Sequence, residues 1–431
     1  MTASATKESV NERCALSPKF LPGDSYAGML LLAANIAYWM LAGAYTPFLS
    51  AYFTAIGLSA TQTGVLLTIQ PLAVIFIQPL WARLSDRTGK RKLVLSFLVA
   101  ASAVSVLLYY LGIRFATVLF ATVVFSLFFS ALLPLCDALV IDGCSTHGVE
   151  FARVRMGGTL GYAFVVFVAG SFLDVNPSAQ FALVAVLCVI FLITVFLLPV
   201  ARSFEMGAQD TLQDDDSNDM SDEPDEPDKH SVLGIFTTSE IYYVLAFAFV
   251  SQMGLGFSGS FLGRYVVELG FGQGLVGVLS AVSALSEVPI LLFAGPIVRR
   301  FGEMRLLIAS CFFMVLRIVM IGVGVVPTMV IGQLMQSVTY MTVYYSCTRY
   351  VASHVLPGRQ SQGQSVLVMV QSGMAMLMAN LAGGMIGDAF GMQMSFYLSA
   401  LLVLMGTVGV FLAYRARGRH GQGISAVGHM Q

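Results

Sequence analysis

The sequence predicts an all-α membrane protein in which twelve transmembrane helices form two six-helix bundles. Three observations favour this fold class. First, 57% of the 431 residues are hydrophobic, only 11% are charged and the mean hydropathy is +0.80. A soluble domain of this composition would have too few polar residues to cover its surface. Second, the chain contains about twelve apolar windows of the roughly 20 residues that a helix needs to cross the hydrocarbon. Third, a polar stretch divides these windows six and six.

The windows follow one another along both halves of the chain, and each is apolar enough to cross a bilayer as a helix. In order, they cover residues 26–52, 60–82, 93–112, 115–141, 153–174, 178–200, 236–266, 273–298, 304–325, 327–352, 362–387 and 391–414.

The polar stretch between the halves is strongly acidic. Eleven of the 24 Asp and Glu residues lie between Glu205 and Asp228, together with two prolines. Such a composition cannot bury enough apolar surface to fold alone. We therefore expect a disordered cytoplasmic linker at 203–235, with a regulatory docking segment as the alternative. The chain then divides into a cytoplasmic N-terminal tail at 1–24, bundles at 25–202 and 236–415, and a cytoplasmic C-terminal tail at 416–431.

The distribution of lysine and arginine predicts the orientation in the membrane. With the N-terminus in the cytoplasm, twenty of the 23 Lys and Arg residues fall in the tails, in the connections on that side or at the adjoining helix ends, as the positive-inside rule requires. The exceptions are Arg114 and Arg264 outside and Arg317 within the membrane. We therefore expect a multi-pass protein of the inner (cytoplasmic) cell membrane with both termini in the cytoplasm.

Four ionisable residues interrupt the apolar windows: Asp137, Arg155, Glu287 and Arg317. A charged side chain at the bilayer centre costs about 2.5–3.5 kcal/mol on insertion scales, so we expect these residues to pair around a polar cavity. Asp137 with Arg155 can bind a polyol or a carboxylate through paired hydrogen bonds, with a structural salt bridge as the alternative. Glu287 with Arg317 is the candidate proton site, because a movement that changes their distance changes proton affinity. A static buried ion pair is the alternative there.

Polar and aromatic residues are expected to line the same cavity. Asn35 and Tyr38 are three residues apart and share one helix face. Gln336 and Tyr340 belong to a polar, aromatic stripe in the tenth window, and Gln371 lies in the eleventh. Neutral groups of this kind suit uncharged hydroxylated or amphipathic aromatic solutes, and hydrogen bonding between helices explains them equally well.

No feature of the sequence predicts catalysis or a bound cofactor. It has no nucleotide-binding glycine loop and no nucleophile with a base at a recognisable spacing. Its six cysteines show neither paired nor metal-binding spacing. No basic footprint for nucleic acid is present. We therefore expect no enzyme activity, no metal, no cofactor and no nucleic-acid partner.

The two halves of the chain contain a weak internal repeat. Residues 82–91 align without gaps on residues 295–304, which lie 213 positions later. The two segments share a small residue, a basic residue and a glycine. Parallel repeats of six helices describe the two halves of major facilitator transporters.

The segment from Pro79 to Lys92, PLWARLSDRTGKRK, resembles the signature between helices 2 and 3 of the major facilitator superfamily. In that family an acidic residue and its basic neighbours form a cytoplasmic charge relay that latches one conformation. The family's leading glycine is Ala82 here, which is still small enough for helices to approach closely. The resemblance, with its degenerate second copy, implies gating roles for Asp86, Arg87, Arg91 and Arg300.

Within this superfamily the chain resembles the proton-coupled lactose-permease-like symporters, including the phenylpropionate permease branch. The matching segments are 43–48, 78–80 and 151–156. In lactose permease a carboxylate of helix 4 lies 18 residues before an arginine of helix 5, as Asp137 lies before Arg155 here. The resemblance implies that Asp137 and Arg155 bind a sugar and that Tyr162 replaces the tryptophan that stacks on it.

Several charged residues implied by this resemblance are absent. Gln333 and Gln336 stand where a lysine and a histidine are expected, Thr339 where a proton-carrying glutamate is expected, and Gln371 in place of a lysine. Glu287 lies one helical turn after the expected glutamate. Neutral groups have thus replaced charged partners together, which leaves the substrate open.

These patterns lead us to expect secondary active transport by alternating access. The first hypothesis is proton-coupled symport of a sugar or oligosaccharide. The alternatives are proton-coupled uptake of an aromatic acid or nucleoside, an exporter, or a non-transporting sensor on the same fold. The expected partners are a small-molecule substrate, protons and membrane lipid, and the expected oligomeric state is a monomer.

Overall fold

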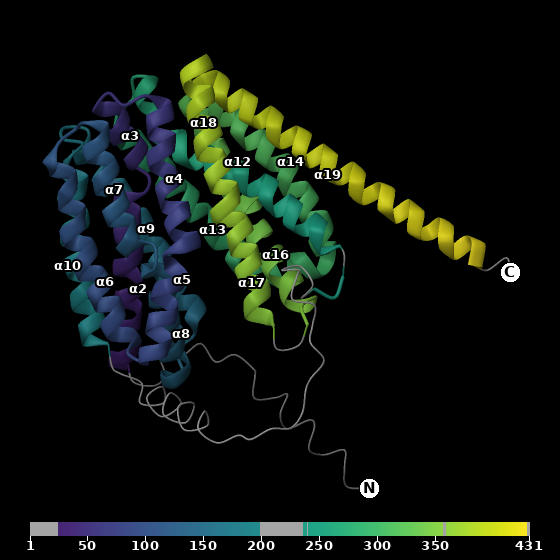
Figure 1. The fold of residues 1–431 in the computed structure, drawn as a ribbon, viewed down its shortest axis with the longest axis horizontal. Coiled ribbons are helices and arrows are strands. Elements are labelled where there is room, and N and C mark those ends of the chain that lie inside the picture. The colour runs from purple at the N-terminus through teal and green to yellow at the C-terminus, as the bar shows by residue number, and fades with distance from the viewer. Residues whose placement is uncertain (1–24, 199–235, 239, 357–358, 429–431) are drawn as a thin grey trace, which may run out of the picture.

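The structure is a computed structural model that describes residues 25–198, 236–238, 240–356 and 359–428. The tail predicted at 1–24 and the linker predicted at 203–235 lie outside these residues. Helices make up nearly all of the described chain and form two groups that stand side by side (Figure 1).

The first bundle has six helical spans, three of which are broken near a proline. Pro47, Pro79 and Pro134 each lack the amide that would continue the helix, and their rings clash with the preceding turn. The spans are α2 (Ser25–Tyr45) with α3 (Leu49–Ala55), α4 (Ala60–Phe76) with α5 (Gln78–Thr88), α6 (Arg91–Ser105) with η2 (Val106–Leu111), α7 (Phe115–Phe129) with α8 (Leu132–His147), α9 (Phe151–Leu173) and α10 (Ala179–Leu197).

The second bundle repeats this order of spans. Two of its spans contain π-helical turns, η4 and η5, a feature that often marks functional positions in helices. The last helix continues past residue 415, where we expected a tail to begin. The spans are α12 (Ile241–Glu268), α13 (Gln273–Phe301), α14 (Glu303–Gly322), α15 (Val326–Leu334) with η4 (Ser337–Met341) and α16 (Thr342–Ser353), α17 (Gln360–Val368) with η5 (Met369–Ala375) and α18 (Met376–Phe390), and α19 (Met392–Gly428).

Among the described residues, ten helical segments are long and apolar enough to cross a membrane. The other two spans are α13 and the α15–η4–α16 segment, which pack against α14 and against each other inside the second bundle. They carry the polar residues Glu287 and Gln336 at mid-length. The predicted fold class, twelve transmembrane helices in two bundles, is confirmed.

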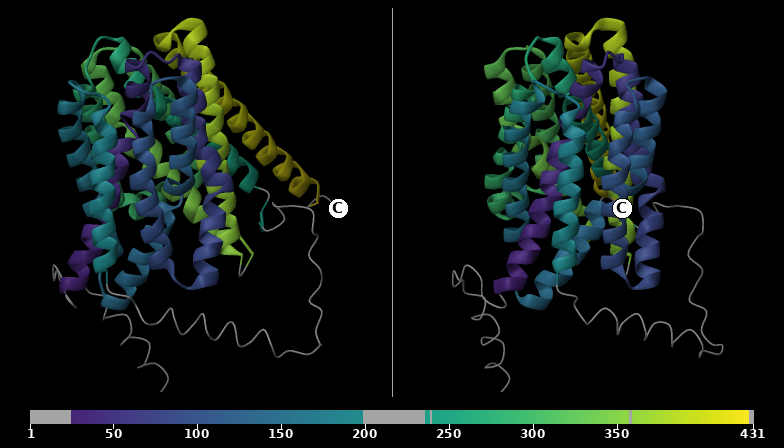
Figure 2. Two further views of the ribbon diagram at one scale, coloured as in Figure 1. Left: turned by 60° about the vertical axis from the view of Figure 1, so that its left-hand side comes forward. Right: turned by 90° about the vertical axis from the view of Figure 1, so that its left-hand side faces the viewer.

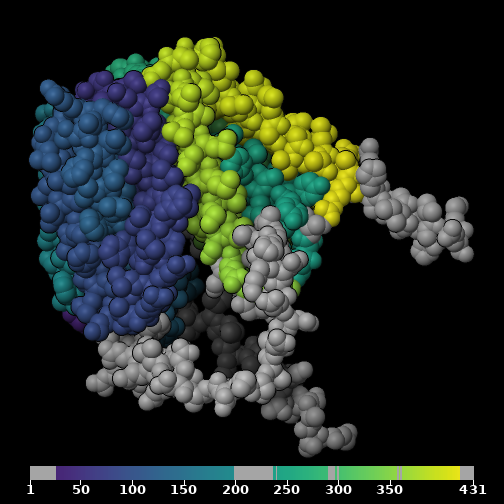
Figure 3. Space-filling view, viewed as in Figure 1, coloured from purple at the N-terminus to yellow at the C-terminus, as the bar shows by residue number. Residues whose placement is uncertain are grey.

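The two bundles meet at one end of the molecule and diverge at the other. Across the interface α4 packs against α18, α9 against α13, and α3 against α12. We call the closed end, with loops 56–59, 112–114, 174–178, 269–272, 323–325 and 391, the sealed end. The opposite end, where α2 begins and α8 ends, is the terminal end. Figure 3 shows the bundles in contact at the top, the sealed end, and a hollow between them lower down, and Figure 2 gives two side views with the sealed end uppermost.

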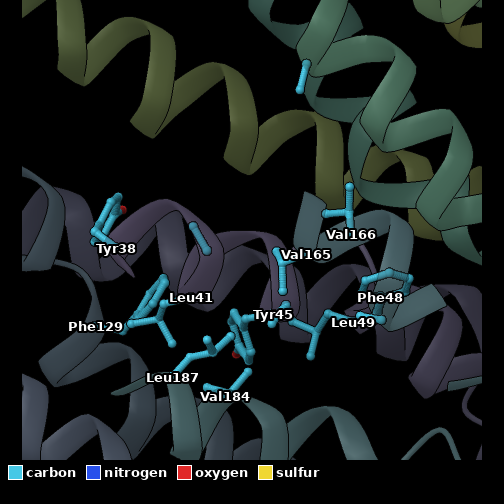
Figure 4. Close-up of a cluster of buried hydrophobic side chains, with 14 of the residues drawn as sticks. Tyr38, Leu41, Tyr45, Phe48, Leu49, Phe129, Val165, Val166, Val184 and Leu187 are labelled. Carbon is cyan, nitrogen blue, oxygen red and sulfur yellow. The ribbon is translucent and has the colours of Figure 1, made fainter. Parts of the chain in front are cut away.

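Large apolar side chains fill the interior of each bundle. In Figure 4, Tyr38 and Tyr45 of α2 pack beside Phe129 and Leu187 of neighbouring helices. The hydroxyls of Tyr45 and Tyr109 hydrogen-bond to each other at 2.9 Å, so these buried polar groups are satisfied. The outward faces of α9 and α10 expose phenylalanine and other large apolar residues, as contact with lipid tails requires.

Candidate functional site

Arg155 is held against an aromatic ring. It comes from α9, and its Cζ lies 3.8 Å from the centroid of the Trp39 ring on α2. The two helices can approach this closely because residue 158 is glycine; a Cβ there would collide with Asn35 and Trp39. A cation–π contact of this kind contributes about 0.5–2 kcal/mol. The Nη1 atom of Arg155 is buried and has no hydrogen-bond partner among the described residues.

Asp137 of α8 lies in the electrostatic field of Arg155 without pairing with it. The carboxylate interacts electrostatically with Arg155 and with Tyr38. In the described parts of the chain no salt bridge joins Asp137 to Arg155, and Oδ1 of Asp137 is buried without a partner. The structure therefore brings the predicted pair together and leaves one donor and one acceptor open.

Two tyrosines extend this group across the interface between the bundles. Tyr162 of α9 has its ring 6.4 Å from that of Trp39 and interacts electrostatically with Glu287 of the second bundle. Tyr340 of η4 interacts in the same way with Glu287 and with Arg155 of the first bundle. Groups from both bundles thus share one site, as alternating access requires.

Glu287 of α13 is bound by a neutral amide. Gln336 Nε2 donates a hydrogen bond to Glu287 Oε1 at 3.1 Å. The carboxylate is also within electrostatic reach of Arg155 in the opposite bundle and of Arg317 in its own. An amide side chain can donate to a carboxylate and, after a flip, accept from the protonated acid. Glu287 can therefore change its protonation state without losing this partner.

We expected Glu287 to pair directly with Arg317, but in the structure each of them hydrogen-bonds to neutral side chains. Arg317 is only 2% exposed. It donates from Nη1 to Thr339 Oγ1 and from Nη2 to Gln333 Oε1, both at 3.1 Å. A buried guanidinium needs hydrogen-bond acceptors, and these neutral side chains supply them while Gln336 holds Glu287.

The remaining predicted lining residues are buried in packed regions. Asn35, at 0% exposure, lies where α2 meets α9, and Tyr38 packs edge-on against Phe191 of α10 with ring centroids 5.9 Å apart. Gln371 is buried on η5 with its Nε2 unpartnered among the described residues. The residues that gather at the interface between the bundles are Asp137, Arg155, Tyr162, Glu287, Gln336 and Tyr340.

The predicted gating residues lie at the terminal end. Arg91 forms ion pairs with Asp142 at 2.7 Å and with Asp86 at 3.4 Å. Both pairs stay within the first bundle. Arg87 and Arg300 are exposed, and the guanidinium of Arg300 lies 5.7 Å from the ring of its neighbour Phe301.

One residue of these groups, Trp39, was not predicted as a member. The available indication was that it lies four residues after Asn35, on the same predicted polar face. The pairing of Asp142 with Arg91 had no local indication, because the two residues are 51 positions apart. In the described ranges no group of three or more His, Cys, Asp or Glu residues is placed to hold a metal ion.

Two six-helix bundles related by an internal repeat, with charged and polar groups buried where they meet, define a transporter of the major facilitator class. The model of the MFS_1 like family matches residues 32–398, and the chain belongs to this family. Its curated relatives include lactose-permease-like proteins, as the sequence predicted. The chain is thus a multi-pass integral membrane protein of this family.

Named relatives differ in how much of the chain they match. Maltose permease of Geobacillus stearothermophilus is 27% identical over 271 residues, 62% of this chain and 64% of that protein. Raffinose permease of Escherichia coli is 31% identical over 33% of this chain and 36% of the relative. The chain thus spans less than two thirds of these two relatives. A probable 3-phenylpropionic acid transporter of Escherichia coli (strain K12) is 24% identical over 75% of this chain and 82% of the relative.

Solved structures show the same fold at low sequence identity. The nucleoside transporter NupG superposes with a TM-score of 0.74 at 14% identity, covering 90% of this chain and 99% of that one. The POT family transporter PepTSo gives 0.69 at 12% identity, covering 92% and 99%.

Proposed function

We propose that this transporter is a proton-coupled symporter that takes up a sugar or oligosaccharide by alternating access. The observation that carries the proposal is the position of Glu287, whose hydrogen-bond partner is the neutral Gln336 and whose cationic neighbour Arg155 belongs to the other bundle. Rocking of the bundles changes the distance from Glu287 to Arg155. A nearby cation favours the ionised form of a carboxylate, so this movement can load and release a proton.

The open hydrogen-bonding groups support a hydroxylated substrate. Asp137 Oδ1 is an unpartnered acceptor and Arg155 Nη1 an unpartnered donor. A sugar hydroxyl can donate to the first and accept from the second, whereas a carboxylate offers only acceptors. The names of the maltose, raffinose and lactose permeases among the relatives point to the same class.

The second candidate is uptake of an aromatic acid. It is favoured by the relative named as a probable 3-phenylpropionic acid transporter and by the aromatic groups Trp39, Tyr162 and Tyr340 around the site. Arg155 would then bind the carboxylate, and Asp137 would have to be protonated to avoid repulsion.

The positive-inside rule orients this proposed carrier. Because most Lys and Arg residues lie at the terminal end and in the tails, we place that end in the cytoplasm of a monomer in the inner membrane. The structure would then be the inward-facing state, with the sealed end outside.

The test is transport by the purified protein in proteoliposomes. Labelled maltose, raffinose, lactose, 3-phenylpropionate and uridine are supplied with and without an inwardly directed proton gradient. We expect gradient-driven accumulation of one of the sugars by the wild type. In Glu287→Gln, which mimics the protonated state, we expect exchange of that sugar to survive and accumulation to vanish.

Glu150→Gln is the matched control, because Glu150 pairs with Arg153 on the surface of one bundle at 2.9 Å. It should accumulate the sugar like the wild type. Full accumulation by Glu287→Gln would place proton coupling elsewhere, and uptake of 3-phenylpropionate alone would favour the second candidate.

A further inference from the structure

Two carboxylates at the sealed end reach from one bundle onto the first turn of a helix in the other. Asp388, near the end of α18, accepts hydrogen bonds from Ser59 Oγ at 2.8 Å, from the Ala60 amide at 2.7 Å and from the Thr61 amide at 2.8 Å. These groups are the N-cap and the first two residues of α4. We call this set the α4 latch.

The second contact has the same form with the bundles exchanged. Asp174, which ends α9, accepts the Gly274 amide on both carboxylate oxygens, at 3.1 and 3.2 Å. Gly274 is the second residue of α13, whose N-cap, Gly272, has no side chain with which to cap it. We call this set the α13 latch.

The two latches are related by the internal repeat. Asp388 follows Asp174 by 214 positions, and the N-cap residue Gly272 follows Ser59 by 213. Residues 82–91 and 295–304 of the internal repeat are also offset by 213 positions, so the two latches match this repeat to within one residue. The same contact, between the end of the fifth span of one half and the start of the second span of the other, is thus present twice, once in each direction across the interface.

We propose that Asp174 and Asp388 are the gating residues of the sealed end, each capping a helix of the opposite bundle and so stabilising the closed state. The first amides of a helix lack partners inside the helix, and an anion at this terminus also interacts favourably with the helix dipole. Both contacts must break when the bundles part at this end. Their loss leaves without a partner the Ala60 and Thr61 amides of α4, which its own capping box of Ser59 and Gln62 does not reach, and the Gly274 amide of α13.

The residues around Asp174 fit this role. A Cβ on Gly272 would collide with the Asp174 carboxylate, and one on Gly274 would come within 3.0 Å of Oδ2. The φ of Gly272 is −81°, so its backbone does not require glycine. The space occupied by the carboxylate accounts for the absence of a side chain there.

The latches are not the sole contacts that close this end. Arg264 of α12 donates to the Leu58 carbonyl at 2.9 Å. Removal of the latches should therefore shift the balance between states and leave the protein folded. We expect Asp388→Asn to raise the ratio of open to closed sealed ends about tenfold, and Asp174→Asn, which loses a smaller set of bonds, about threefold.

The measurement is the labelling rate of a cysteine at position 50 in purified full-length protein. Ser50 is 2% exposed and lies against Gly263 of α12, so Ser50→Cys is reached by a bulky maleimide only when the sealed end opens. Cys14 is replaced by serine, and the other five cysteines are buried. This assay needs neither a substrate nor a proton gradient, so its result is independent of the proposed sugar symport.

Three further variants make the result decisive. Gly272→Ser supplies α13 with a cap of its own while displacing Asp174, and it should speed labelling like Asp174→Asn without loss of thermal stability. Asn176→Ala, which removes a hydrogen bond to Ser178 inside the first bundle, should leave the rate unchanged. Ile113→Cys, on an exposed loop of the same end, reports intrinsic thiol reactivity.

An unchanged rate in Asp388→Asn, Asp174→Asn and Gly272→Ser would overturn the proposal. An increase in Asn176→Ala equal to that in the latch variants would do the same, because the effect would then not depend on contacts between the bundles.

Discussion

Arg155 and Asp137 show how two charges can share a buried region without forming a salt bridge. Trp39 covers one face of the guanidinium, and the edge of Arg155 that carries Nη1 stays free. The cost of leaving polar groups unpaired in a buried region is about 1–3 kcal/mol each. A ligand that pairs with both groups removes this cost, which is a source of binding energy.

Asp137→Asn and Arg155→Gln should therefore weaken binding of the transported solute by roughly 2–5 kcal/mol each, because each removes a buried charged group that hydrogen-bonds the solute. Calorimetric titration of the purified variants with the solute found in the uptake assay measures this loss. Arg153→Gln is the matched control, since Arg153 lies two residues away and pairs with Glu150 on the surface. Near-normal affinity in both site variants would show that the solute binds elsewhere.

At the scale of helices, the contact between α2 and α9 positions the site. Three glycines of α9, Gly157, Gly158 and Gly161, leave room for side chains of α2. A Cβ at any of these glycines would collide with one of those side chains. The position of Trp39 under Arg155 follows from this close approach. Small residues at such contacts allow helices in membranes to pack through van der Waals interactions.

Gly158→Ala should destabilise the protein by about 1–3 kcal/mol, because the added methyl group forces Asn35 and Trp39 out of their positions. Thermal unfolding in detergent, followed by circular dichroism, measures the change. Gly259→Ala on α12 is the control, because no atom lies within 4 Å of the position that its added Cβ would take. Equal unfolding temperatures for the two variants would contradict the packing argument.

At the scale of the whole molecule, the two ends of the interface are held by different groups. The sealed end is closed by contacts between bundles, whereas at the terminal end Arg91 forms ion pairs with Asp86 and Asp142 of its own bundle. When the terminal end closes, the second bundle approaches these residues, and we expect their charges to contact it in that state. The two sets of charges should therefore favour opposite states.

Asp86→Asn should lower the labelling rate of Ser50→Cys, opposite in sign to the effect of Asp388→Asn, because it weakens the state in which the sealed end is open. A several-fold decrease corresponds to about 1 kcal/mol, a usual value for an exposed charge contact. Glu150→Gln at the same end serves as the control. A faster rate in Asp86→Asn would instead show that the charge cluster around Arg91 stabilises the state in which the sealed end is closed.

Much of the fold was predictable because hydropathy and charge are properties of short segments. The spans, their division into two groups and the position of the site near Asp137, Arg155 and Glu287 all follow from local composition and from the cost of charge in a membrane. Arg317 marks the limit of this reasoning. Its depth was predicted, but its acceptors, Thr339 and Gln333, depend on how neighbouring helices are rotated.

By itself, the sequence determined the class of protein, the number of spans and which residues are too costly to leave unpaired in lipid. Only the tertiary structure decided which groups meet: Trp39 under Arg155, Gln336 on Glu287, and Asp388 and Asp174 on the helices of the opposite bundle. The acids of the latches lie at helix ends, where a carboxylate is ordinarily solvated, so nothing local distinguishes them. The physical reason is that the burial of a side chain follows from its own polarity. The partner of a side chain depends instead on the packing of helices that can lie 100 residues or more apart in the chain.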